Sequence, residues 1–210
     1  MYTPDKVGFD KIYVLHLPRR SERRKRLEAA MIDLKLDVSF FKGVDGKQIV
    51  VKRYKKVLIL EDDATFFPMF RKQWSRIAAD IDEFVPNWEL IYLGRKALNS
   101  SEEKPVNGTQ LLVWPDYSYW GVAYALSLTG AKKLVKQKLL SKLLPVDEFL
   151  PIMFNKHPEG KWKSYFSPKD LIAVSVNPLL IEPAWFPGDR HYISDTESSI
   201  PVNFTKLRER

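Results

Sequence analysis

The feature that most restricts the fold of this chain is a run of four apolar residues, Val57 to Leu60, that ends directly in three carboxylates, Glu61 to Asp63. A short continuous apolar run is typical of a central parallel strand that is buried on both faces. Similar strand patterns alternate with helical patterns along the chain, which predicts an α/β domain with a doubly wound, mostly parallel sheet. The other predicted strands are 11–17, 38–41 and 89–94, and the predicted helices are 22–36, 71–84, 127–140 and 149–154.

The length and composition fit one domain, which we expect over residues 1–210 with an irregular tail at 183–210. A formal net charge of +8 favours an anionic partner: nucleic acid, a membrane surface or a phosphorylated small molecule. The chain has no cysteine, which excludes disulfides, thiolate catalysis and cysteine zinc sites. No apolar run approaches the roughly 18 residues of a membrane span, and neither end carries a signal core or a retrieval tetrapeptide, so the sequence itself indicates no compartment.

Glu61, Asp62 and Asp63 are candidate metal ligands because they follow a buried strand. In open α/β sheets, ligands bind at the carboxyl ends of the strands. Hard divalent cations take oxygen ligands and often sit between one or two carboxylates and the phosphates of a substrate. The position alone fits an acidic turn that caps the next helix equally well.

A second candidate site is basic and follows the first predicted strand. Arg19 and Arg20 lie in the turn between strand and helix, where arginine can bind phosphate in a bidentate manner with help from the helix N-terminus. Arg23 to Arg26 lie within the predicted helix, and for them a solvated helix face is the favoured interpretation.

Asp147 and Glu148 form a carboxylate pair between a proline-containing and an apolar segment. Such a pair could bind or deprotonate an acceptor hydroxyl. The residues alone fit capping of a helix start better. His16, His157 and His191 have no metal-ligand spacing, and His16 is interpreted as structural because it lies in an apolar strand.

Taken together, these segments resemble glycosyltransferase family 25, whose members include the procollagen galactosyltransferases of animals. The resemblance covers nearly the whole chain in order, which makes it more specific than any single motif. The matching segments are 8–10, 19–20, 23–24, 44–47, 61–63, 90–96, 116–120, 127–131, 143–151, 156–158 and 194–197.

The resemblance implies a GT-A-like nucleotide-sugar-binding fold that transfers galactose from UDP-galactose to hydroxylysine of collagen, with Mn²⁺, in the endoplasmic reticulum lumen. The Mn²⁺ would bridge the donor diphosphate and neutralise charge on the departing UDP. An acidic acceptor site also suits the cationic side chain of hydroxylysine. The implied residues are Glu61, Asp62 and Asp63 for the metal, Leu17, Arg19, Arg20 and Arg95 for the donor, and Asp147 and Glu148 for catalysis at the acceptor.

The connection before the acidic motif is shorter than the family pattern. Ten residues, Lys47 to Lys56, join Gly46 to Val57, where the family carries a longer segment with a helix. Two parallel strands need a crossover of about a dozen residues or more, usually a helix. We therefore expect the fold to lack one crossover segment, the apolar surface of Val57 to Leu60 to be left open, and the chain to have little or no transferase activity.

Two rival functions stay open. A catalytically dead homologue could act in adhesion or as a scaffold; the retained Glu61 to Asp63 favours an enzyme, and the short connection favours the dead homologue. A basic nucleic-acid-binding protein ranks below both, because the positive charge has no base-stacking motif beside it. The expected partners are thus a nucleotide sugar and a collagen-like polypeptide, with no nucleic acid and no membrane span.

Overall fold

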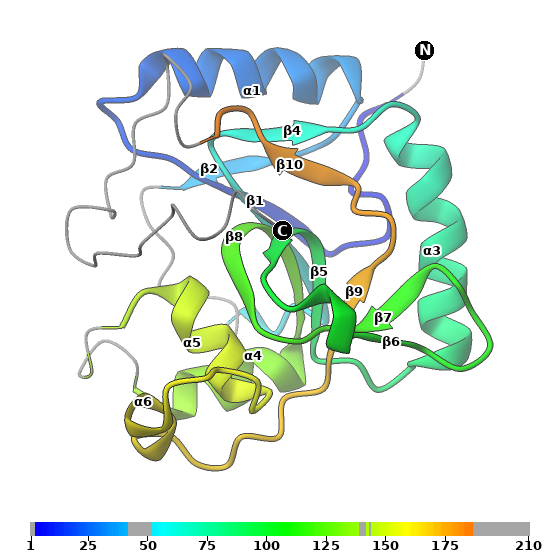
Figure 1. Ribbon diagram of the computed structural model, residues 1–210. Coiled ribbons are helices and arrows are strands. Elements are labelled where there is room, and N and C mark those ends of the chain that lie inside the picture. The colour runs from blue at the N-terminus through cyan, green and yellow to red at the C-terminus, as the bar shows by residue number, and fades with distance from the viewer. Residues whose placement is uncertain (1–2, 42–51, 139–141, 143, 187–210) are drawn as a thin grey trace.

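The computed structural model describes residues 3–41, 52–138, 142 and 144–186 (Figure 1). These residues form an eight-stranded sheet in the order β2-β1-β3-β8-β5-β9-β7-β6 and a two-stranded sheet of β10 and β4. The strands are β1 (Lys11–Leu15), β2 (Ser39–Phe41), β3 (Lys56–Glu61), β4 (Ala64–Phe66), β5 (Leu90–Ala97), β6 (Lys104–Pro105), β7 (Leu112–Trp114), β8 (Ser118–Ser127), β9 (Ala173–Val176) and β10 (Ile181–Pro183).

Helices cover both faces of the large sheet, so the predicted α/β class is confirmed. One core contains apolar side chains of α1 and α3, and a second core contains those of α4 and α5. Figure 1 shows α1 above and α3 to the right of the strands, with α4, α5 and α6 below them. The helices are α1 (Ser21–Asp33), α3 (Phe70–Phe84), α4 (Leu128–Lys136), α5 (Val146–Met153) and α6 (Gly160–Ser164), with a 3₁₀ turn η1 (Ser100–Glu102). No helix among the described residues is long and apolar enough to cross a membrane.

The large sheet is mixed. β1 pairs in parallel with β2 and β3, and β5 pairs in parallel with β9. β8 is antiparallel to both of its neighbours, β3 and β5, and β7 is antiparallel to β9 and β6. Two strands, β7 and β8, therefore run against the direction of the other six.

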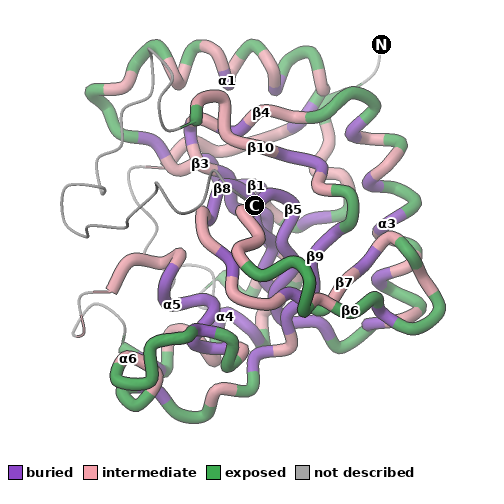
Figure 2. Tube along the Cα trace, viewed as in Figure 1, coloured by how far each residue is buried: buried purple, intermediate pink, exposed green. Residues whose placement is uncertain are grey.

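Strand β3 lies between β1, to which it is parallel, and β8, to which it is antiparallel, and it is covered on both faces. Its side chains alternate, so that Leu58 and Leu60 join the core under α1 and α3, whereas Val57 and Ile59 join the core under α5. At most 1% of each of these four residues is exposed. The expectation that this strand would be left open is wrong, because α1 and α3 cover one face and the later helices α4 and α5 cover the other (Figure 2).

Half of the short connection expected at 47–56, residues 47–51, lies outside the described residues. Its last residue, Lys56, already belongs to β3, and the preceding strand β2 ends at Phe41. The predicted irregular tail also begins differently, because Pro183 is still paired in β10, and residues 187–210 lie outside the described part.

Strand β10 crosses the large sheet at a point where β5 has no side chain. A Cβ on Gly94 would lie 2.4 Å from the carbonyl oxygen of Ile181 and 2.7 Å from Cγ1 of Val122. The backbone N–H of Leu180 donates to the carbonyl of Leu93 at 3.0 Å, which fixes this crossing. Gly94 is therefore required by a close approach of two backbones.

We expect Gly94→Ala to destabilise the fold, because the added methyl group collides with backbone and cannot be absorbed by a side-chain rotation. Overpacking of this kind costs about 1–3 kcal/mol, which corresponds to a decrease of about 2–12 °C in Tm for a chain of this size. Thermal unfolding followed by circular dichroism measures the effect. Gly160→Ala is the matched control, because a Cβ there meets nothing within 4 Å; equal Tm values for the two variants would contradict the close approach.

Candidate active site

The acidic turn, Glu61 to Asp63, lies at the carboxyl end of β3, next to the carboxyl end of β1. Leu15 of β1 is in register with Glu61 of β3. Asp62 is buried, and its Oδ2 accepts a hydrogen bond from the backbone N–H of Leu17 at 3.3 Å. The structure thus brings Leu17 and the acidic turn together at one edge of the sheet, as parallel pairing requires.

Two arginines of α1 lie against the acidic turn. Nη1 of Arg23 is 3.3 Å from Oδ1 of Asp62 and 3.7 Å from Oδ2 of Asp63. Arg26 donates from Nη1 to Oγ1 of Thr65 and from Nη2 to the carbonyl of Ala64, both at 3.0 Å. Both guanidinium groups lie over the ring of Trp185, 5.2 and 5.1 Å from its centroid.

The expectation of a solvated face for Arg23 to Arg26 is wrong for Arg23 and Arg26. It fits Lys25, which is exposed and pairs with Glu22. Arg24 pairs with Glu28, but its guanidinium also lies over the ring of Phe40, 4.6 Å from the centroid. Spacing alone does not separate these residues, because Arg23 and Arg24 lie four and three positions before the fully buried Leu27.

Arg19 and Arg20 lie in the turn between β1 and α1, at the same edge of the sheet as the acidic turn. Arg19 is exposed and Arg20 is half-buried. The backbone N–H of Arg20 donates to the carbonyl of Leu17 at 2.8 Å, which closes the turn. Their position is compatible with phosphate binding at the start of α1, and that role stays a prediction.

The start of α5 approaches the acidic turn across β8. A methyl group on Gly121 of β8 would lie 3.7 Å from Oε1 of Glu61 and 3.8 Å from Cγ1 of Val146. Asp147 follows Val146 in the first turn of α5. Two acidic motifs that are far apart in the sequence are therefore close to each other in the fold, and Gly121 leaves room between them.

Strand β8 bulges next to this point. Its register with β5 shifts between Gly94 and Lys96, and Trp120 has a positive φ of 61°. Bulges re-aim side chains and are frequent beside active sites. Here the ring of Trp120 lies 5.8 Å from the ring of Phe186, with Nζ of Lys96 4.9 Å from the Trp120 centroid.

The carboxylates at this site shift one another's pKa. Burial, together with Asp63, Asp147 and Asp62, raises the pKa of Glu61 to about 8. Burial and the neighbouring Glu148 raise the pKa of Asp147 to about 6. Burial also raises the pKa of Asp63, although the Arg23 guanidinium acts in the opposite direction. The site therefore holds more buried carboxylate than its arginines neutralise.

The donor set of the acidic turn fits a hard divalent cation. Its groups are carboxylate oxygens, and Oδ1 of Asp63 is buried without a hydrogen-bond partner. Among the described residues, no group of three or more Asp, Glu, His or Cys side chains is arranged to hold a metal ion by itself. A substrate diphosphate could supply further oxygen ligands.

Glu148, the neighbour of Asp147, lies in a buried polar cluster. Its Oε2 accepts from the hydroxyl of Tyr117 at 2.9 Å and contacts Nε2 of His157 at 2.8 Å. Because Nδ1 of His157 accepts from the backbone N–H of Glu159 at 3.0 Å, the ring proton of a neutral His157 is on Nε2, and Nε2 donates to Glu148. No motif in the sequence indicates this pairing of His157 and Tyr117 with Glu148.

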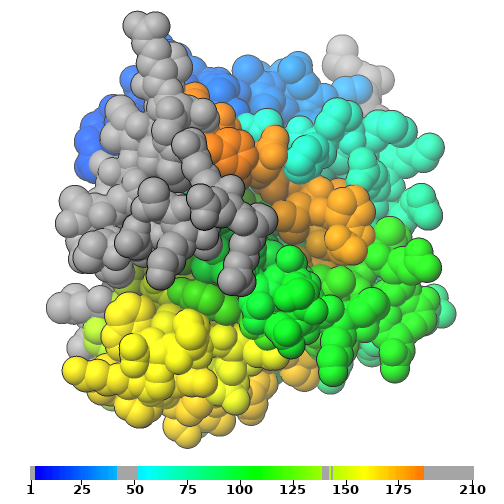
Figure 3. Space-filling view, in the orientation of Figure 1, coloured from blue at the N-terminus to red at the C-terminus, as the bar shows by residue number. Residues whose placement is uncertain are grey.

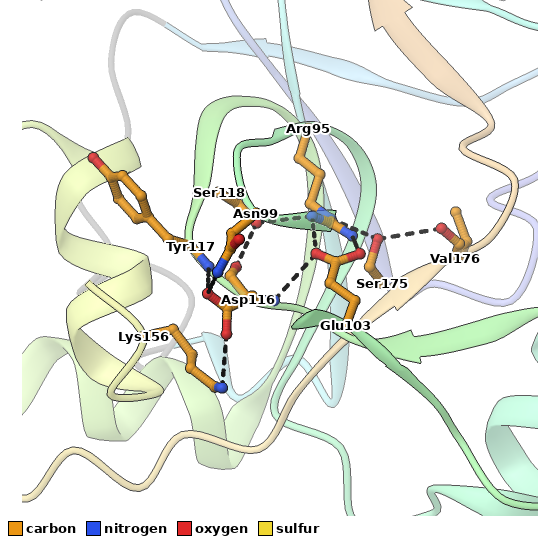
Figure 4. A network of polar contacts seen from close by, with 9 residues as sticks. All are labelled: Arg95, Asn99, Glu103, Asp116, Tyr117, Ser118, Lys156, Ser175 and Val176. Carbon is orange, nitrogen blue, oxygen red and sulfur yellow. Dashed lines mark hydrogen bonds and ion pairs between the residues drawn. The ribbon is translucent and has the colours of Figure 1, made fainter. Parts of the chain in front are cut away.

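Arg95 is buried in a network of the chain's own polar groups (Figure 4). It donates to both carboxylate oxygens of Glu103, at 2.7 and 2.8 Å, and to the hydroxyls of Ser118 and Ser175, at 2.9 and 2.8 Å. These contacts tie β5 to β8, β9 and the segment after η1. The structure gives Arg95 a supporting role, and a contact with the donor stays a prediction.

Comparisons with known proteins give relatives along nearly the whole chain, although no family model matches. The chain is 38% identical to "Glycosyltransferase 25 family member" of Aedes aegypti, over 97% of this chain and 40% of that protein. It is 37% identical to "Procollagen galactosyltransferase 2" of Mus musculus, over 93% of this chain and 38% of that protein. It is 36% identical to "Inactive glycosyltransferase 25 family member 3" of Homo sapiens, over 94% of this chain and 40% of that protein.

The chain thus spans about 40% of the length of these relatives. The alignment with the Aedes aegypti protein covers 247 positions, whereas the chain has 210 residues, so at least 37 aligned positions have no residue of this chain. A solved structure, "a glycosyltransferase involved in the glycosylation of the major capsid of PBCV-1", covers 78% of this chain and 80% of its own at 13% identity and a TM-score of 0.37. That score is too low to carry an argument about the fold.

The raised pKa of Glu61 predicts a specific pH dependence of stability without added metal. On folding, the pKa of this carboxyl rises from 4.5 to about 8. Its contribution to the free energy of unfolding is therefore fully present below pH 4.5 and is lost as the pH rises through about 8. We therefore expect the Tm of the unaltered chain to fall more steeply from about pH 5 to about pH 8.5 than that of Glu61→Gln. Thermal unfolding at a series of pH values, in the presence of a chelator, measures this change in Tm, with Glu22→Gln at an exposed position as control. Parallel curves of Tm against pH for the unaltered chain and Glu61→Gln would contradict the raised pKa of Glu61.

Proposed function

Because this chain belongs to the glycosyltransferase 25 family, we propose that it forms a GT-A-like domain that transfers galactose from UDP-galactose to hydroxylysine of collagen. The observation that carries the proposal is the meeting of the acidic turn with Asp147 across Gly121. This arrangement provides a diphosphate side and an acceptor side at one sheet edge. Mouse procollagen galactosyltransferase 2, by its name, supports galactose and collagen as the substrate classes.

The donor side consists of Leu17, Arg19, Arg20 and the acidic turn. The guanidinium groups at the start of α1 can bind the diphosphate in a bidentate manner. The backbone N–H of Leu17 donates to Oδ2 of Asp62, which orients this carboxylate at the donor side. A divalent cation such as Mn²⁺, shared by these carboxylates and the diphosphate, would stabilise the negative charge of the departing UDP.

The acceptor side is formed by Asp147. With a pKa of about 6, its carboxylate is mostly ionised at neutral pH and can take a proton from a hydroxyl group. The acceptor oxygen then forms a bond to the anomeric carbon of galactose, the bond from that carbon to the diphosphate breaks, and UDP leaves with the electron pair. Negative charge around Asp147 also attracts the ammonium group of hydroxylysine.

Glu148 contributes to the same step through position. Tyr117 and His157 both donate to its carboxylate, which anchors the first turn of α5. Because Asp147 is the preceding residue, this anchoring limits where its carboxylate can lie. We assign Glu148 as a positioning residue beside the proposed base.

An inactive homologue is the second candidate function. The human relative is named an inactive family member, and at least 37 aligned positions of the Aedes aegypti relative are missing from this chain. The described core is nevertheless closed over β3, so the missing positions do not leave that strand exposed.

The proposed compartment, from the family resemblance, is the endoplasmic reticulum lumen.

Replacement of the proposed base tests the function directly. In an assay with UDP-galactose, Mn²⁺ and a hydroxylysine-containing collagen peptide, we expect Asp147→Asn to lower kcat by about 10²–10⁴-fold with UDP affinity within about twofold. The rate of the unaltered chain should rise with pH through about 6, because Asp147 acts in its ionised form. Binding of UDP without any transfer by the unaltered chain would favour the inactive homologue.

The donor side is tested by a pair of double variants. We expect Arg19→Ala with Arg20→Ala to weaken UDP binding by at least about tenfold, because charge-assisted hydrogen bonds contribute about 1.5–3 kcal/mol each. Arg24→Ala with Lys25→Ala is the matched control, since these side chains pair with Glu28 and Glu22 of the same helix rather than with the acidic turn. Isothermal titration measures both; equal losses would indicate a diffuse basic field in place of a binding site.

A further inference from the structure

The contacts of Arg23 differ in kind from those of its neighbour Arg26. Arg26 donates to a hydroxyl and a backbone carbonyl, both at 3.0 Å, and neither acceptor is a proposed metal ligand. Arg23 reaches carboxylates of the acidic turn itself, at the longer distances of 3.3 and 3.7 Å. Arg26 is thus fixed to β4, whereas Arg23 contacts the carboxylates that a cation would use.

The place of Arg23 in α1 is electrostatically unfavourable without those carboxylates. It is the third residue of a helix that begins at Ser21. The N-terminal turn of a helix carries partial positive charge, which disfavours a cationic side chain there. Asp62 and Asp63 compensate this effect, and Arg23 in turn opposes the raised pKa of Asp63.

We propose that Arg23 is the resident counter-ion of the acidic turn, and that a divalent cation must displace its guanidinium from Asp62 and Asp63 in order to bind. This rests on the proposed function only in assigning the acidic turn to a metal. Arg23 then competes with the free cation and keeps its binding weak. Once displaced, the guanidinium lies beside the site of the diphosphate, where it gains a new anionic partner.

The displacement couples the two ligands. A nucleotide diphosphate draws Arg23 away from the carboxylates and so strengthens cation binding, and by linkage the cation strengthens nucleotide binding by the same factor. Trp185 provides a surface along which the guanidinium can move, because it lies over both arginine side chains. Metal and nucleotide would therefore bind with positive cooperativity.

Direct titration of Mn²⁺ tests this proposal without any transfer reaction. Free Mn²⁺ is followed by electron paramagnetic resonance for the unaltered chain, Arg23→Gln and Arg23→Lys, with Lys25→Gln as control on the outer face of the same helix. We expect Arg23→Gln to bind Mn²⁺ alone about tenfold more tightly, because a competing charge in a partly buried site is removed. Arg23→Lys and Lys25→Gln should stay within about twofold of the unaltered chain.

A second arm adds UDP. The unaltered chain should gain at least about fivefold in Mn²⁺ affinity, and Arg23→Gln should gain clearly less, because its coupling residue is absent. If Arg23→Gln does not fold, Arg23→Met, which retains an unbranched stem under Trp185, replaces it in both arms. Unchanged or weaker binding of Mn²⁺ by the neutral variant overturns the proposal, as does the absence of Mn²⁺ binding in every variant with and without UDP.

Failure of the proposed function has a different signature. A chain that transfers no galactose but shows tighter Mn²⁺ binding in Arg23→Gln supports the counter-ion role. Transfer of galactose together with the same Mn²⁺ affinity in all variants would support the proposed function and contradict the proposed role of Arg23.

Discussion

The pairing of β3 with β1 on one side and β8 on the other is the constraint on which the site depends. Parallel pairing with β1 places Leu17 and the start of α1 beside the acidic turn. Antiparallel pairing with β8 places Gly121, and through it the first turn of α5, on the other side of Glu61. Two-sided burial of β3 holds this edge rigid, since its four apolar residues are closed off from solvent.

Charge is the second organising factor. Several carboxylates lie together in a half-buried region at the sheet edge, and arginines of α1 neutralise part of their negative charge. The raised pKa of Glu61, about 8, means that this carboxyl is largely protonated at neutral pH, which reduces the repulsion among the carboxylates. Groups with shifted pKa values that lie together at a strand end are a frequent mark of functional sites.

The sequence allowed the strand at Val57 to Leu60 and the acidic turn at its carboxyl end to be predicted, because both follow from a local pattern. The strand β8 was not predicted, and its position between β3 and β5 could not be, since local patterns do not determine the order of strands in a sheet. The open face expected for Val57 to Leu60 was wrong because α1 and α3 cover one face of this strand and α4 and α5, from later in the chain, cover the other. The cluster of Glu148 with His157 depends on a loop conformation that no motif in the chain indicates.

The crossing of β10 over the large sheet also determines when the site can form. On the face shown in Figure 3, the orange segment around β10 lies between the blue and cyan first part of the chain and the green segment. Phe66 of β4 pairs with Ile181 of β10, which lies more than a hundred residues later in the sequence. The backbone N–H of Ala184 donates to the carbonyl of Asp63. During synthesis from the N-terminus the acidic turn therefore leaves the ribosome long before the strand that completes its surroundings, and such distant pairings close slowly. Until that strand arrives, the nascent chain presents an unpaired β4 edge and a cluster of carboxylates to whatever chaperones surround it.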